Sequence, residues 1–183
     1  MSVVIETISA GSSLAEQAVE LILEVQKKTD LPPRELWEPG RLAEHTRKRH
    51  ETALSVWVAL DGQRVVGHGL IRVVPANHPE FSRVSDSIVR QALAAGHLLE
   101  LGGLTVHPSW QRQGIGEALV SARLAWIGRL PEPMVTVSVV WRNSVGSQML
   151  AHRYGVCVGS GTNGPYDIFR YNLTTSTILH QRV

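Results

Sequence analysis

Residues 98–120 read LLELGGLTVHPSWQRQGIGEALV, and this stretch contains the pattern of a strand, a turn and the start of a helix. The apolar run Leu98–Val106 is typical of a buried strand, and the Pro in His107–Trp110 favours a turn after it. A helix is predicted over residues 114–130, before Pro131 and Pro133, because apolar residues recur at helical spacing. Its apolar face comprises Ile115, Ala118, Leu119, Ala122, Trp126 and Ile127.

The helix start has the properties of an anion site. Backbone N–H groups at the first turn have no acceptor within the helix, and the helix dipole adds partial positive charge there. Gly114 and Gly116 allow a phosphate to approach the backbone closely, so a diphosphate is the expected ligand. From these residues alone, the alternative interpretation is a strand-to-helix turn that binds no ligand. A Rossmann dinucleotide site fits poorly, because its third glycine would fall at Leu119.

The same segment resembles motif A of the GNAT superfamily of N-acetyltransferases, whose pattern is Arg/Gln-x-x-Gly-x-Gly/Ala. Gln111, Gly114 and Gly116 fill those positions, and the Val-His-Pro step upstream is spaced as in that family. The resemblance implies an enzyme that transfers an acetyl group from acetyl-CoA, its cosubstrate, to a primary amine by direct transfer in a ternary complex. The coenzyme A contacts implied are Leu104, Thr105 and Val106 for the pantetheine arm, Gln111, Arg112, Gln113, Gly114, Ile115, Gly116 and Glu117 for the pyrophosphate, and Asn143.

Outward from this segment, the chain alternates strands and helices. Strands are predicted at Val3–Ile8, Leu54–Leu60, Arg64–Val74, Met134–Val140, Val156–Gly159 and Tyr166–Leu173, and helices after Ser13, over 41–52, over 85–94 and from about Ser144 to Tyr154. Ser13 and Glu16 form a capping-box pattern, and Gly155 is predicted to be a left-handed helix cap.

The order of these elements indicates an α/β protein with hairpins, and hence a mixed sheet. It matches the GNAT fold, which implies one domain over residues 1–183. In that fold a central, mostly antiparallel twisted sheet is flanked by helices, and here a helix is inserted between the third and fourth strands.

Amine acylation needs a base, and Glu100 is the leading candidate. It lies six residues before Val106 and therefore shares that residue's strand face. A Glu paired with a nearby Arg is an equally weighted alternative. The family's usual acid, a Tyr, would fall at Ala151, and its Asn at Ser144, with Asn143 one residue early.

The acid is therefore left open among Tyr166, Ser147 and water. Tyr154 is expected to be a half-buried capping aromatic, and His107 to have a structural or solvent position.

Composition narrows the class of protein further. A net charge of +2 gives no argument for nucleic acid, and the basic triplet Arg47, Lys48 and Arg49 is expected to lie on a solvated surface. The histidines form no metal-ligand pattern, and the one cysteine, Cys157, is expected to be buried and inert. With no signal-peptide pattern and no apolar run long enough for a membrane, a cytoplasmic protein is expected.

The acceptor amine is not marked in the sequence, and either a small molecule or a peptide fits. The family places it near residues equivalent to Leu31–Trp37 and Val74–His97. The second segment could equally form the acceptor site, a lid or a homodimer contact. Trp37 and Trp57 are expected to be either pocket or core residues. A GNAT-fold module that binds acyl-CoA without catalysis is the alternative function.

Overall fold

The computed structural model describes residues 3–27, 38–78, 81, 84–161 and 165–171. The chain forms two compact units. One comprises the residues up to Ile71 together with Gly103–Leu119, and the other comprises Arg72–Gly102 and the residues from Val120 on. Strands β3 and β4 and helix α4 each pass from one unit into the other.

The order of elements agrees with the one predicted. It is β1 (Val3–Ile8), α1 (Ser13–Lys27), α2 (Pro39–Glu51), β2 (Ser55–Asp61), β3 (Arg64–Val73), α3 (Ser87–Ala95), β4 (Leu98–Val106), the short 3-10 helix η3 (Pro108–Trp110), α4 (Ile115–Ile127), β5 (Val135–Trp141), α5 (Val145–Tyr154), β6 (Gly155–Ser160) and β7 (Tyr166–Tyr171). The strands follow the order β1-β2-β3-β4-β5-β7-β6. The β4–β5 pair is parallel, whereas β1–β2, β2–β3, β5–β7 and β6–β7 are antiparallel, so the sheet is mixed as expected.

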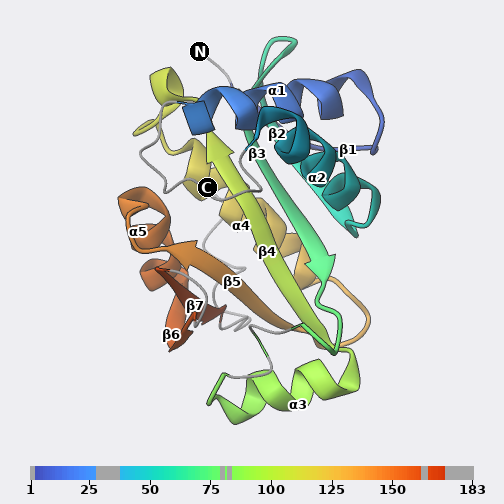
Figure 1. Ribbon diagram of the computed structural model, residues 1–183, viewed down its shortest axis with the longest axis vertical. Helices are drawn as coiled ribbons and strands as arrows, with labels where there is room; N and C mark the ends of the chain where they lie inside the picture. Colours follow the sequence, from blue (N-terminus) through green and yellow to red (C-terminus); the bar gives the residue numbers. More distant parts are fainter. Residues whose placement is uncertain (1–2, 28–37, 79–80, 82–83, 162–164, 172–183) are drawn as a thin grey trace. The chain divides into compact units, whose positions relative to one another are not determined.

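In the first unit, alternate residues of β2 and β3 supply two different cores. Val58 and Val65 pack with Ala18 and Leu21 of α1. Ala59 and Val66 pack with the first turns of α4 and with Trp110. The sheet in this unit therefore has α1 on one face and the start of α4 on the other, with α2 beside α1 (Figure 1).

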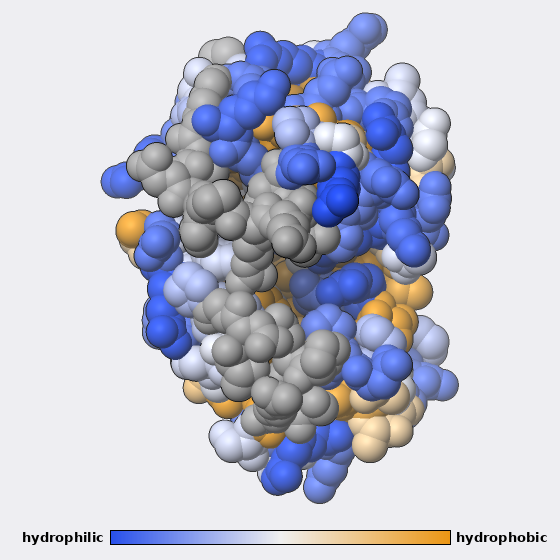
Figure 2. All heavy atoms as spheres, in the orientation of Figure 1, coloured by the Kyte–Doolittle hydropathy of each residue, from blue (hydrophilic) through white to orange (hydrophobic). Residues whose placement is uncertain are grey.

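Helices α1 and α2 turn charged side chains outward, and hydrophilic atoms predominate over them in Figure 2. Arg47 donates to both carboxylate oxygens of Glu16, at 2.7–3.1 Å. Lys48 is exposed and Arg49 is half-buried. The basic triplet thus fans out around the helix, as the sequence predicted.

The second unit has its own core on each face of β5 and β7. Val137 and Ile168 pack with Val89 and Leu93 of α3, while Phe169 packs on the α5 side. Helix α3 is capped at its start by Asp86, whose carboxylate accepts the Val89 N–H at 3.0 Å, and at its end by the left-handed Gly96.

Two predictions about helix ends were wrong. Ser12 caps α1, since its hydroxyl accepts the Ala15 N–H, while the Glu16 carboxylate is engaged by Arg47. Gly155 has a φ of −147° and begins β6. A glycine fits there because a Cβ would lie 2.7 Å from the Arg170 carbonyl oxygen.

One burial prediction also failed. Cys157 is exposed, because β6 is the last strand in the sheet order and Val156 and Cys157 face solvent. Thr136 and Ser138 are buried, because the second unit has helices on both faces of β5. Within the described residues, no helix is long and apolar enough to span a membrane.

Candidate functional site

The candidate site begins where β4 loses its pairing with β5. The parallel ladder joins only Leu98–Glu100 to Val135–Val137, although both strands continue. Backbone groups of β4 beyond Glu100 therefore lie outside that ladder and are free of β5. Gly103 has a φ of 64°, a left-handed backbone typical of a β-bulge, and the half-buried Leu104, Thr105 and Val106 follow it.

The turn after β4 is held firmly. The His107 N–H donates to the Val66 carbonyl at 2.9 Å, and Ser109 N–H donates to His107 Nδ1 at 3.2 Å. Since Nδ1 accepts, Nε2 of a neutral His107 carries the proton, and it lies 3.3 Å from a Glu24 carboxylate oxygen. His107 is buried, so the structural role predicted for it fits its place. Trp110 is buried against Ile115 and Leu119.

Beyond the turn, the loop side chains bond back to the strand end. The Gln111 amide donates to the Val106 carbonyl at 3.0 Å, and the Gln113 amide donates to the Ser109 carbonyl at 3.2 Å. Arg112 has a φ of 64° and is the sole non-glycine with positive φ among the described residues. A left-handed non-glycine residue costs free energy, so its presence points to a functional conformation.

Gly114 follows, with a φ of 80°, and a Cβ built on it meets no atom within 4 Å. Its carbonyl accepts the first α4 hydrogen bond, from Ala118 N–H at 2.9 Å. The N–H groups of the next residues are therefore those of a helix start, with the dipole's positive end. Open space over a glycine at a helix start is compatible with a diphosphate, which stays a prediction.

Gly67 lets α4 lie close to the sheet at this point. A Cβ on Gly67 would lie 3.0–3.1 Å from side-chain atoms of Leu119, Ala59 and Ile115. Because Gly67 of β3 has no side chain, the first turns of α4 can lie directly against the sheet, and this fixes where the helix starts.

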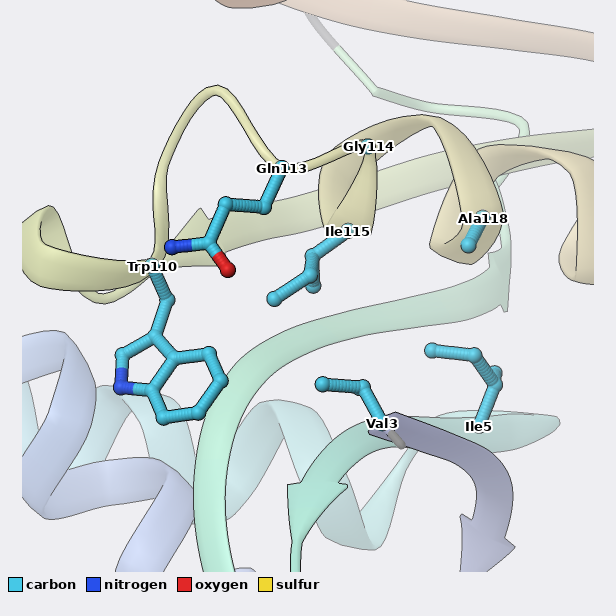
Figure 3. A pocket seen from close by; sticks show the side chains of 7 residues that line it. All are labelled: Val3, Ile5, Trp110, Gln113, Gly114, Ile115 and Ala118. Atoms are coloured by element: carbon cyan, nitrogen blue, oxygen red, sulfur yellow. The ribbon is translucent and has the colours of Figure 1, made fainter. Parts of the chain in front are cut away.

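A pocket of about 280 Å³ adjoins the loop (Figure 3). β1 and the start of α4 contribute apolar walls together with Trp110, and Gln113 supplies the polar side chain. The residues that line it are Val3, Ile5, Trp110, Gln113, Gly114, Ile115 and Ala118.

Glu100 lies in the second unit and is 6% exposed. Its Oε2 accepts from Arg72 Nε at 2.5 Å and also forms an ion pair with Arg72 Nη2. The pairing of Glu100 with an Arg, which the sequence offered as an alternative, is therefore present. It is compatible with Glu100 acting as a base, and that role stays a prediction.

Most of the other predicted residues lie on or near α5 in the second unit. Asn143 is exposed in the turn after β5, and Ser147 accepts from Ser144 at 2.9 Å. Ala151 is buried. Tyr154 is half-buried, as predicted for a capping aromatic, and its hydroxyl lies 3.2 Å from the Ser121 hydroxyl. Tyr166 is buried and packs against Trp141. Trp57 packs in the first unit's core, Trp37 lies outside the described residues, and no cluster of metal-ligating side chains occurs among those described.

Three buried basic side chains near β4 were missed by the sequence reasoning. His68 and His50 lie 3.0 Å apart in the first unit, and Arg123 of α4 donates to the Gly102 carbonyl at 3.1 Å in the second. Burial of its guanidinium lowers the pKa of Arg123 to about 10, with Tyr171 acting the other way. The Gly102-Gly103 pair inside a predicted strand was the available signal, because consecutive glycines in a strand indicate a bulge.

Comparison with protein families identifies the fold. The acetyltransferase (GNAT) family model matches residues 19–139, well over half of the 183 residues, and the chain belongs to that family. No curated protein sequence is similar enough to count as a relative.

Solved structures agree on the fold at low sequence identity. The PaiA N-acetyltransferase from Thermoplasma acidophilum, in complex with coenzyme A, has 17% identity and a TM-score of 0.64, covering 94% of this chain and 99% of that one. NAA60 from Arabidopsis thaliana, in complex with acetyl-CoA, has 15% identity and a TM-score of 0.61, with 93% and 98% covered. The ribosomal-protein-S18-alanine N-acetyltransferase from Escherichia coli has 14% identity and a TM-score of 0.55, with 92% and 91% covered.

Proposed function

We propose that residues 1–183 form one N-acetyltransferase domain, which moves an acetyl group from acetyl-CoA to a primary amine in a ternary complex. The observation that carries the proposal is the left-handed loop before α4. It presents the open face of Gly114 at a helix start, directly after the part of β4 that is free of β5.

In this proposal the residues of the loop hold coenzyme A. Backbone N–H groups from Gln111 to Glu117 bind the pyrophosphate, and the backbone of Leu104, Thr105 and Val106 binds the pantetheine arm. The Gln111 amide is engaged with the Val106 carbonyl, so its contribution to phosphate binding comes from its backbone. Asn143, which is exposed in the turn after β5, is a further coenzyme A contact in this proposal.

The chemistry needs few groups. The neutral amine attacks the thioester carbonyl, the carbon–sulfur bond breaks, and the acetyl group ends on nitrogen. The coenzyme A thiolate takes one proton, and the amine loses one. A backbone N–H of β4 polarises the carbonyl, and Glu100 receives the amine proton through water. A thiol has an ordinary pKa near 8.5, so the thiolate leaves tolerably without the family's Tyr.

The acceptor is proposed only as a primary amine on a small molecule or a peptide. The Escherichia coli structural neighbour acts, by its name, on an alanine of a ribosomal protein. A test panel therefore includes peptides with a free N-terminus beside polyamines, aminoglycosides and amino acids.

The test is calorimetric titration with acetyl-CoA, followed by thiol release over the amine panel. Binding with thiol release on some amine supports the enzyme. Binding without release on any amine favours the non-catalytic acyl-CoA module, and no binding overturns the proposal.

Gly114→Ala and Gly62→Ala form a matched pair for the same test. Both glycines have positive φ, 80° and 58°, and a Cβ on either meets nothing within 4 Å. Each alanine should cost about 1–2 kcal/mol of stability for its left-handed backbone. Only Gly114→Ala should weaken acetyl-CoA binding, by about tenfold or more, because only Gly114 lies at the proposed phosphate site.

A further inference from the structure

Two buried histidines of the first unit have no part in the proposed transfer. His50 of α2 and His68 of β3 are 3% and 1% exposed, with their Nε2 atoms 3.0 Å apart and their ring planes 40° apart. The other ring nitrogen of His68, Nδ1, lies 2.8 Å from the Gly103 carbonyl oxygen. A chain of hydrogen bonds thus runs from α2 through β3 to the bulge of β4.

The direction of these bonds follows from the carbonyl. A carbonyl oxygen only accepts, so His68 Nδ1 carries a proton. In a neutral His68 the Nε2 atom then accepts, and His50 Nε2–H donates to it. Burial, followed by the charge of Arg49, lowers the pKa of His50, which favours this neutral arrangement, while Glu16 acts in the opposite direction.

The His68 ring also fits the shape of the bulge. A Cβ on Gly103 would lie 3.0 Å from His68 Cε1, and the residue has a φ of 64°. A side chain at this position would therefore crowd the imidazole that reaches this carbonyl. The Thr105 hydroxyl donates to the same oxygen at 3.3 Å.

Holding the Gly103 carbonyl fixes more than one atom. The carbonyl of Gly103 and the N–H of Leu104 belong to one planar peptide, trans like every described peptide bond, so they point in opposite directions. An imidazole bound to the carbonyl therefore sets the direction of the Leu104 N–H.

We propose that His68, supported by His50, is a positioning residue that orients the Gly103–Leu104 peptide so that the Leu104 N–H is preset to bind the pantetheine or thioester end of acetyl-CoA. This inference rests on the proposed function. Neither histidine contacts the reacting atoms. Their effect is preorganisation, which lowers the cost of aligning a donor at the moment of reaction.

The test replaces His68 in two ways. His68→Leu removes both ring nitrogens, whereas His68→Asn retains an N–H donor close to the position of Nδ1. His68→Leu should lower kcat/KM for acetyl-CoA about tenfold to a hundredfold, which is a smaller loss than removing a hydrogen-bond donor of the site outright would cause. His68→Asn should keep most of the wild-type kcat/KM. His152→Leu, at an exposed histidine of α5 in the second unit, is the control.

A second readout separates positioning from general damage. The probe is 3′-phosphoadenosine 5′-diphosphate, the nucleotide part of coenzyme A, which reaches the phosphate loop and lacks the pantetheine arm. Its Kd should stay within about twofold in every His68 variant. If His68→Leu does not fold, His68→Gln replaces it: its amide reaches toward His50 instead of Gly103, so its kcat/KM should fall below that of His68→Asn.

The outcomes are distinct. A wild-type chain that binds acetyl-CoA and releases thiol, with His68→Leu as active as wild type, overturns the inference and leaves the proposed function standing. Equal losses of nucleotide and acetyl-CoA binding also overturn it, since they indicate a merely structural role. A wild-type chain that binds no acetyl-CoA overturns both.

Discussion

At the scale of single residues, the state of His50 makes stability depend on pH. Burial and Arg49 lower its pKa from the ordinary 6.5 in the folded chain. The unfolded chain therefore takes up a proton at about pH 6.5 that the folded chain still refuses, so folding stability falls as the pH drops below 6.5 toward the folded value.

His50→Gln tests this dependence. The glutamine amide can still donate to His68 and does not titrate. The variant should lose about 1 kcal/mol at pH 7.5, yet its urea midpoint should change less than that of wild type between pH 7.5 and 5. Parallel pH curves for the two proteins would show that another group carries the dependence.

The Glu100–Arg72 ion pair also belongs to the residue scale. Glu100→Gln keeps acceptor atoms for Arg72 but cannot take a proton from water. If Glu100 is the base, kcat should fall about 10²–10⁴-fold while the Kd for acetyl-CoA stays unchanged. Arg72→Met is the comparison, since it removes the ion pair of a buried carboxylate and should cost about 3–5 kcal/mol of stability. A Glu100→Gln enzyme with normal kcat would mean that the carboxylate serves only the ion pair.

Among the elements, α3 depends on its cap. Asp86 accepts the Val89 N–H and pairs with Arg170 at 3.2 Å. Burial alone would raise the pKa of Asp86, but the backbone hydrogen bond and Arg170 together outweigh it and lower the pKa from 3.8. This stabilisation is present above pH 3.8 and is lost as the pH falls through the lower folded value.

Asp86→Ala should therefore cost about 1–2 kcal/mol at pH 7, measured by urea unfolding. Asp86→Asn keeps the cap and loses only the charge pairing, so its cost should be smaller. Equal costs would assign the effect to Arg170 instead of the cap.

Helix α4 depends on the glycine beneath it. Gly67→Ala places a methyl group against Leu119, Ala59 and Ile115, and should cost about 1–3 kcal/mol through overpacking. Because the same shift moves the start of α4, acetyl-CoA affinity should fall as well. Gly146→Ala, on α5 with open space around it, is the control, and unchanged affinity in Gly67→Ala would separate helix position from ligand binding.

Most elements were predictable because local patterns specify them. β1 and β4 have their predicted bounds, and α3 was placed within two residues of its ends. Errors arose where the deciding contact is distant in sequence. Gly155 meets the Arg170 carbonyl across a strand pair, which no local pattern reveals.

The site divides in the same way. The Gly114 loop was predicted, since its motif is local. The bond from His68 to Gly103 joins residues 35 positions apart, so only the fold brings them together.

At the scale of the whole molecule, three elements pass between the two units, and this continuity favours joint unfolding. We expect circular dichroism and tryptophan fluorescence to report one coincident transition in urea. Acetyl-CoA at about 100 times its Kd should add about 2.7 kcal/mol to the free energy of unfolding. Two separate transitions, of which only one responds to the ligand, would contradict a single domain.

The exposed Cys157 on β6 has a practical bearing on that work. It is the chain's one cysteine, so a maleimide dye would attach at a single known position in the second unit and report on unfolding there. The same thiol would also react with a disulfide reagent used to count released coenzyme A, and would add a fixed background of one equivalent per chain. Cys157→Ser removes that background at a solvent-facing position, and is the sensible parent for every kinetic variant.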